Sequence, residues 1–156
     1  MRKSILFVCL GNICRSPAAE AVFLESLRIK NLQNKFIVDS AGTGGWHVGR
    51  LADKRMREAA LKRGISIDSK ARQICLDDFE RFDQILTMDD SNFADVNSLA
   101  KELVKPSNTQ VRSLMSYSKN QSIQEVPDPY YGGDQGLEEV LDLLEEAIEG
   151  LLHKIN

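Results

Sequence analysis

A short segment near the start of the chain combines a thiol, a tight turn and an arginine. Cys9 ends an apolar run, and Arg15 and Ser16 follow it closely. Gly11 and Asn12 lie between them. Both residue types tolerate left-handed backbone geometry, which lets successive N–H groups point inward as a nest. The arginine adds a planar fork that can grip two oxygens of a phosphate-like group. The segment therefore predicts a binding site for a tetrahedral oxyanion.

Cys9 lies at the opening of this predicted cradle. A helix N-terminus and a nearby arginine favour the thiolate, which is the nucleophilic form of cysteine. A thiolate that faces a bound phosphoryl group is arranged for attack on phosphorus, and Ser16 can donate a hydrogen bond to the sulfur. As alternatives, Cys9 is only a small buried hydrophobic residue, or Cys9 and Cys14 bind zinc. Three cysteines and two histidines in the whole chain argue against a metal site.

Strands and helices that alternate along the chain must position this turn. Residues 4–9 predict a strand buried on both faces, and Ser16 and Pro17 predict the N-cap and the first position of a helix. This alternation predicts an α/β fold with three layers, in which helices cover both faces of a four-stranded parallel sheet. Further strands are expected at 36–38, 83–88 and 110–114, with helices at 52–63 and 137–155.

The ends of the predicted strands indicate where the site lies. Ligands of parallel α/β sheets bind beyond the carboxyl ends of the strands. Cys9, Ser40 and Asp89 all lie at such ends. We therefore expect Ser40 and Asp89 to support the loop that holds the anion. As an alternative, both residues only cap neighbouring elements, as serine and aspartate often do.

Length, composition and charge limit the class of protein. A chain of 156 residues suits one domain with a substantial core. The formal net charge of -3 argues against a nucleic-acid binder that works through bulk charge. No apolar run approaches the roughly 18 residues of a membrane span, so no membrane association is expected. Three cysteines are too few for a disulfide-stapled secreted domain, which favours a cytoplasmic location.

Several segments of the chain resemble, in the same order, those of the low-molecular-weight protein tyrosine phosphatases. The resemblance extends over nearly the whole chain, which implies a single phosphatase domain over residues 1–156. It also fits a flavodoxin-like or Rossmann-like sheet with the strand order 2-1-3-4. The segments that carry the resemblance are 9–16, 39–43, Trp46, 71–73, 88–92 and 127–133.

The resemblance implies hydrolysis of phosphotyrosine in proteins, and of small aryl phosphates, through a phosphocysteine intermediate, with inorganic phosphate as the product. Cys9 would be the nucleophile, and Asp128 would be the general acid. Pro127 and Pro129 stiffen the backbone around Asp128, so its carboxyl group can be presented with little loss of entropy. As an alternative, which composition alone would favour, Asp128 is only an exposed aspartate in a turn. Arg15 and the loop N–H groups would stabilise the charge on the equatorial oxygens, so no metal or cofactor is expected.

The remaining site residues follow from the same resemblance. Trp46, Tyr130 and Tyr131 would form walls around an aryl group, the alternatives being a core tryptophan and surface tyrosines. Cys14 would form a reversible disulfide with Cys9, or would be only a small loop residue. Asn12 would hold the loop through side-chain hydrogen bonds. The phosphate-binding loop would comprise Leu10, Gly11, Asn12, Ile13, Cys14 and Ser16, in addition to Cys9 and Arg15.

Three positions bear on alternative functions. The chain has Ser69 where many members of the family have a histidine, so no role of that histidine is transferred.

Ile13 occupies the position at which protein arginine phosphatases carry threonine, and an apolar side chain there favours an aryl ester over a guanidinium. An arsenate reductase would need two further cysteines downstream, but only Cys75 is present. A non-catalytic phosphate-binding module would be expected to lack the cysteine or the acid, and both are present.

Overall fold

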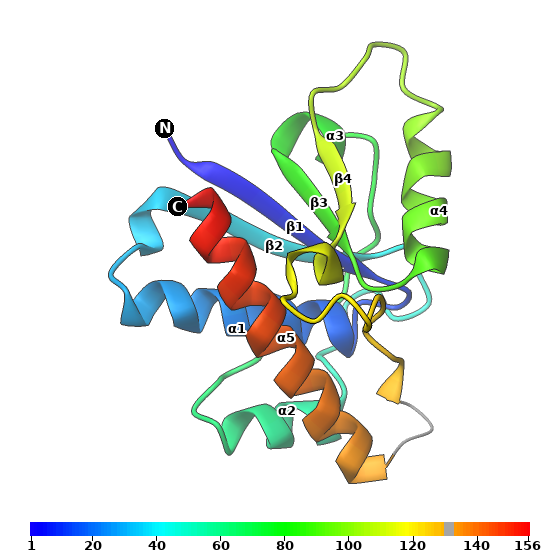
Figure 1. Ribbon diagram of the computed structural model, residues 1–156. Helices are drawn as coiled ribbons and strands as arrows, with labels where there is room; N and C mark the ends of the chain where they lie inside the picture. Colours follow the sequence, from blue (N-terminus) through cyan, green and yellow to red (C-terminus); the bar gives the residue numbers. More distant parts are fainter. Residues whose placement is uncertain (130–132) are drawn as a thin grey trace.

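A computed structural model describes residues 1–129 and 133–156 as a three-layer α/β fold (Figure 1). Its four strands are parallel and lie in the order β2-β1-β3-β4, which confirms the predicted fold and strand order. The carboxyl ends of the strands therefore meet at one edge of the sheet, as the predicted site requires. The strands are β1 (Lys3–Cys9), β2 (Phe36–Gly42), β3 (Gln84–Thr87) and β4 (Gln110–Ser113).

Helices cover both faces of this sheet, and β1 shows why its sequence is apolar throughout. Successive side chains of a strand point to opposite faces. Ile5 and Phe7 pack into the larger core cluster, whereas Leu6 and Val8 pack into the smaller one. The larger cluster lies under α1 (Arg15–Ile29), α2 (Lys54–Leu61) and α5 (Gly133–Ile155), and the smaller lies under α3 (Asp78–Arg81) and α4 (Asp90–Ala100).

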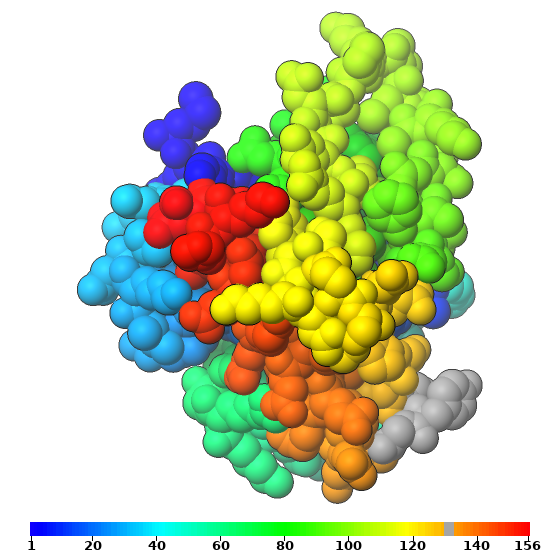
Figure 2. All heavy atoms as spheres, viewed as in Figure 1, coloured from blue at the N-terminus to red at the C-terminus, as the bar shows by residue number. Residues whose placement is uncertain are grey.

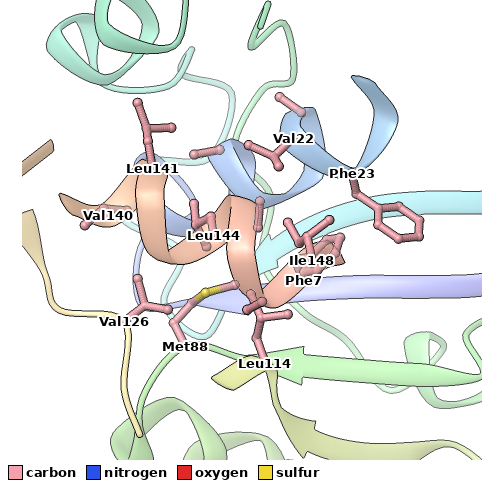
Figure 3. Packing of buried hydrophobic residues seen from close by; sticks show 14 of the residues in the cluster. Phe7, Val22, Phe23, Met88, Leu114, Val126, Val140, Leu141, Leu144 and Ile148 are labelled. Carbon is pink, nitrogen blue, oxygen red and sulfur yellow. The ribbon is translucent and has the colours of Figure 1, made fainter. Parts of the chain in front are cut away.

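The last helix, α5, closes the larger core. Its apolar stripe at helical spacing was evident in the sequence, and its buried residues include Leu144 and Ile148. Figure 3 shows these side chains packed with Phe7 of β1 and Val22 of α1. Figure 2 shows α5 across this face of the molecule, with the yellow residues that follow β4 lying against it. None of the described helices is long and apolar enough to cross a membrane.

Several element bounds differ from the sequence predictions. The second strand continues beyond residue 38 to Gly42, because it pairs with β1 as far as Cys9. The helix expected at 52–63 is the shorter α2, which Asp53 caps by accepting a hydrogen bond from Met56 N at 3.1 Å. The sequence prediction also missed α3 and two 3₁₀ turns, η1 (Gln33–Lys35) and η2 (Leu114–Tyr117).

Candidate active site

The loop between β1 and α1 turns sharply at Asn12, which has a φ of 56°. We expected left-handed geometry to be open to both Gly11 and Asn12, but Gly11 does not adopt a positive φ. A Cβ at Gly11 would lie 2.9 Å from Cδ2 of His47, so that imidazole would have to shift to admit a larger residue. Gly42 plays a similar part at the end of β2, where a Cβ would lie 2.8 Å from the carbonyl oxygen of Leu10.

Neighbouring backbone turns the loop carbonyls outward. Leu10 O accepts a hydrogen bond from Gly44 N at 2.9 Å, and Ile13 O accepts one from Asp53 N at 2.6 Å. The carbonyl of a trans peptide points away from the N–H of the next residue. The N–H groups that follow these carbonyls therefore point toward the concave side of the loop, where they can bind an anion.

The side chain of Asn12 holds the loop in this shape. Its amide nitrogen donates to Ser16 Oγ at 2.8 Å and to Ser40 Oγ at 3.0 Å. Its amide oxygen accepts a hydrogen bond from Arg72 N at 3.0 Å. Asn12 is 1% exposed, so all three bonds are shielded from water. Ser40 thus contacts Asn12 directly.

Ser16 lies beside the sulfur of Cys9 and does not cap the helix. We expected Ser16 at the N-cap, but α1 begins at Arg15, and Cys14 occupies the cap position without a side-chain bond. The N-cap prediction was wrong because the Ser16 hydroxyl is turned into the loop. It lies 3.0 Å from Cys9 Sγ and 3.3 Å from the carbonyl oxygen of Ala41. A hydroxyl at this distance can stabilise a thiolate.

Arg15 is held by two segments that are distant in the sequence. Its Nη1 donates to Asp89 Oδ2 at 2.7 Å and to the carbonyl oxygen of Val126 at 3.0 Å. Both bonds use Nη1, so neither of them occupies the Nε or the Nη2 donor of Arg15. Burial is the largest single influence on Arg15 and opposes its charge, but the hydrogen bond to Asp89 and the negative charges of Cys9, Asp89 and Asp128 together raise the pKa of the guanidinium. Asp89 also caps α4 through Asn92 N at 2.8 Å, so it contacts Arg15 with one carboxylate oxygen and the helix with the other.

A cavity of about 250 Å³ opens over the loop and brings most of the predicted residues together. Trp46 is 70% exposed at its edge, which agrees with the expectation that it is not a core residue. Tyr130 and Tyr131 lie outside the described residues. The cavity is lined by Cys9, Leu10, Gly11, Ile13, Cys14, Arg15, Trp46, His47, Asp53, Arg55, Asp128 and Pro129.

Asp128 reaches this cavity from the segment that precedes α5. Val126 anchors that segment, because its N–H donates to the carbonyl oxygen of Met88 at 2.7 Å while its own carbonyl binds Arg15. Pro129 is buried, whereas Asp128 is exposed at the cavity wall. The acid and the nucleophile thus meet across one cavity, although they are far apart in the sequence. Sequence reasoning missed Val126, since an apolar residue before Pro127 carries no local signal of this role.

Cys14 also lines the cavity, in surroundings that disfavour its charged form. Burial, followed by the charge of Cys9, raises the pKa of the Cys14 thiol well above its usual value. Cys14 therefore stays protonated under conditions in which a thiolate would be needed for attack. Both cysteines are free thiols in this structure.

Glu20 extends the support behind the loop, and sequence reasoning missed it. Its carboxylate accepts a hydrogen bond from Ser40 Oγ at 2.6 Å. Burial raises the pKa of Glu20 despite this bond, and a hydrogen bond from Ser69 also favours the charged form. Ser69 therefore acts on the same carboxyl group.

A larger and more open hollow of about 740 Å³ lies at the amino ends of β3 and β4. Among the residues that line it, Lys105 is the one base, beside four carboxylates. These charges would repel a phosphate monoester, so the smaller cavity over the loop is the better candidate for the active site. The four carboxylates belong to Asp77, Glu80, Asp83 and Glu102.

Comparison with known proteins assigns the chain to a family. The family model described as low molecular weight phosphotyrosine protein phosphatase matches residues 4–156. The chain belongs to this family. A low molecular weight protein-tyrosine-phosphatase of Bacillus subtilis is 41% identical, with 97% of this chain and 95% of the relative covered. The human low molecular weight phosphotyrosine protein phosphatase is also 41% identical, with the same coverage of 97% and 95%.

Solved structures within the family share the fold. A protein tyrosine phosphatase from Entamoeba histolytica superimposes with a TM-score of 0.91 at 41% identity, covering 98% of this chain and 96% of that one. An arginine phosphatase from Drosophila superimposes with a TM-score of 0.93 at 32% identity, covering 100% of this chain and 99% of the other. The fold of this phosphatase family therefore accompanies more than one named specificity, and the residues of the site must decide between them.

Proposed function

We propose that this chain is a cysteine-dependent protein tyrosine phosphatase, which hydrolyses phosphotyrosine in proteins and small aryl phosphates. The observation that carries the proposal is the meeting of Cys9, Arg15 and Asp128 around one cavity over an anion-binding loop. A thiolate, a fixed cation and a carboxylic acid are the three groups that cleavage of a phosphate monoester requires. Membership of the family and the named activities of the relatives support it.

In the first step, Cys9 Sγ forms a bond to phosphorus as the bond from phosphorus to the phenolic oxygen breaks. Asp128 gives its proton to that oxygen, so the leaving group departs as a neutral phenol. Arg15 and the inward N–H groups stabilise the charge on the three equatorial oxygens. The Ser16 hydroxyl, 3.0 Å from the sulfur, stabilises the thiolate before attack.

In the second step, a water molecule attacks the phosphocysteine, and the bond from sulfur to phosphorus breaks. Asp128 now takes a proton from the water, as microscopic reversibility requires. Inorganic phosphate leaves, and the Cys9 thiolate is regenerated beside Ser16. These steps need neither a metal nor an organic cofactor, because Arg15 and the amides supply the positive charge.

The apolar part of the cavity wall favours an aryl ester. Leu10, Ile13 and Trp46 line it, and flat apolar surfaces suit the ring of phosphotyrosine. A protein arginine phosphatase is the second candidate, which the Drosophila relative supports. The apolar side chain of Ile13 argues against it, since a guanidinium leaving group would be better served by a polar partner. We further propose that residues 1–156 act as one phosphatase domain and that the enzyme works in the cytoplasm, where thiols stay reduced.

The proposal is tested with an aryl phosphate and three variants. Cys9→Ser should abolish turnover, and the matched control Cys75→Ser should not, because Cys75 is an exposed thiol in another part of the chain. Asp128→Asn should slow turnover by about 10²- to 10⁴-fold for poor leaving groups and much less for good ones. Equal rates for wild type and Cys9→Ser would exclude the phosphocysteine, and an equal loss for all leaving groups would exclude the acid role.

A further inference from the structure

The first turns of the two helices that begin at the cavity lack acidic residues. Helix N-termini carry partial positive charge, so acidic residues are favoured there and basic residues are not. The first turns of α3, α4 and α5 follow this preference, each with at least one aspartate. By contrast, α1 begins with Arg15 and α2 begins with Lys54 and Arg55, and neither first turn contains an acid. The acid at the start of α2 is its N-cap, Asp53, so both helices place an arginine in the first turn beside the cavity.

Arg15 accounts for the first of these exceptions, because it lies under the phosphate site. Arg55 accounts for the second, since it lines the same cavity from another element. Its side chain is 45% exposed, and its Nε lies 3.9 Å from Asp53 Oδ1, which is too far for a hydrogen bond. That oxygen already accepts a hydrogen bond from Met56 N as the cap of α2. Within the described residues, the guanidinium of Arg55 makes this loose ion pair and no hydrogen bond.

We propose that Arg55 determines substrate specificity by binding a carboxylate side chain adjacent to the phosphotyrosine of a protein substrate. The inference rests on the proposed phosphatase function and adds the class of sequence that the enzyme prefers. The phosphate itself is served by Arg15 and the loop amides, so Arg55 at the cavity wall is available to a neighbouring residue. A guanidinium matches a carboxylate with two parallel hydrogen bonds, and the N-terminus of α2 adds attraction for a negative group.

Lys54 provides a matched control in the same turn. It carries the same charge and also precedes the body of α2, but it is not among the residues that line the cavity. Its side chain is 78% exposed and lies 3.9 Å from Glu58 Oε1, one turn along the helix. Loss of Lys54 therefore removes one positive charge without removing a donor from the cavity wall.

The test compares kcat/KM for three phosphotyrosine peptides that differ only in having glutamate, glutamine or lysine on each side of the phosphotyrosine, and the ratio of glutamate to glutamine peptide measures the preference. Wild type and Lys54→Ala should both prefer the glutamate peptide by about fivefold, the scale of one exposed charge pair. Arg55→Ala should bring this ratio close to one, and Arg55→Glu should shift the preference to a lysine-flanked peptide. High salt should reduce the wild-type ratio, because exposed charge pairs are screened.

Three outcomes would overturn the proposal: a wild-type ratio near one, an unchanged ratio in Arg55→Ala, or the same loss in Lys54→Ala as in Arg55→Ala. The charge reversal separates recognition from a structural effect, since a misfolded cavity would not come to prefer lysine. An aryl phosphate assayed with wild type tests the phosphatase function independently. Failure to hydrolyse that compound would refute the proposed function, whereas hydrolysis without a peptide preference would refute only the role of Arg55.

Discussion

The ion pair between Arg15 and Asp89 offers the sharpest test of how the site is held together. The side chains of Arg15 and Asp89 are 4% and 21% exposed, and their 2.7 Å contact is charge-assisted. We consider Asp89→Asn, which removes the negative charge but keeps the size of the side chain. Its amide oxygen can still cap α4 at Asn92 N, because asparagine and aspartate are equally good caps. Its NH₂ group then faces the guanidinium, where a donor meets a donor.

The expected loss follows from the strength of the lost bond. A hydrogen bond between charged groups contributes roughly 1.5–3 kcal/mol, and the partial exposure of Asp89 favours the lower half of this range. The carbonyl oxygen of Val126 still accepts from Arg15, so the guanidinium is loosened but not released. If the looser Arg15 stabilises the transition state by about 2 kcal/mol less, kcat/KM falls about 30-fold. Asp89→Ala should show a similar kinetic loss and a further loss of about 1 kcal/mol in unfolding free energy, because the cap is also removed.

The assay is kcat/KM for an aryl phosphate, together with urea unfolding of both variants. Comparable kinetics for the two variants with different stabilities would separate the two roles of Asp89. A value for Asp89→Asn within about threefold of wild type would refute the reasoning. It would mean that the loop and Val126 position Arg15 without the help of a negative charge.

Three other predictions concern the loop and its support. Ile13→Thr should raise the ratio of phosphoarginine to phosphotyrosine activity, and an unchanged ratio would remove the reason for ranking the two phosphatases. Because burial raises the pKa of Glu20, wild type should lose unfolding free energy relative to Glu20→Gln as the pH rises above about 4.5. Urea unfolding at about pH 4 and about pH 7 measures this difference, and a constant difference would contradict it. Peroxide should convert Cys9 to a sulfenic acid, which removes the thiolate charge that disfavours ionisation of Cys14. The Cys14 sulfur then displaces the hydroxyl group of the sulfenic acid, and the Cys14 proton leaves with that group as water while the disulfide forms. The fraction of activity recovered with a dithiol should therefore fall in Cys14→Ser, and equal recovery would exclude Cys14 as the partner.

Much of the chemistry could be predicted from the sequence because the nucleophile and the phosphate-binding residues lie in one continuous segment. A strand, a turn and a helix follow one another from residue 3 to residue 29, so Cys9 and Arg15 are placed by local backbone geometry. The apolar stripe of α5 is also local, since helical periodicity reports directly on a buried face. A strand that is buried on both faces is also recognisable locally, because it forms a continuous apolar run. This signal indicated the fold class.

The partners of these groups were decided only by the tertiary structure. Arg15 is held by Asp89 and Val126, which are 74 and 111 positions away in the chain. Ser16 turned out to lie beside a sulfur and not at a helix cap, and Glu20, for which no role was predicted, turned out to bind Ser40. Propensity and periodicity report how one segment is buried, but not which distant segment it meets. That choice depends on the order of the strands, which brings the ends of β1, β2 and β3 to one edge of the sheet.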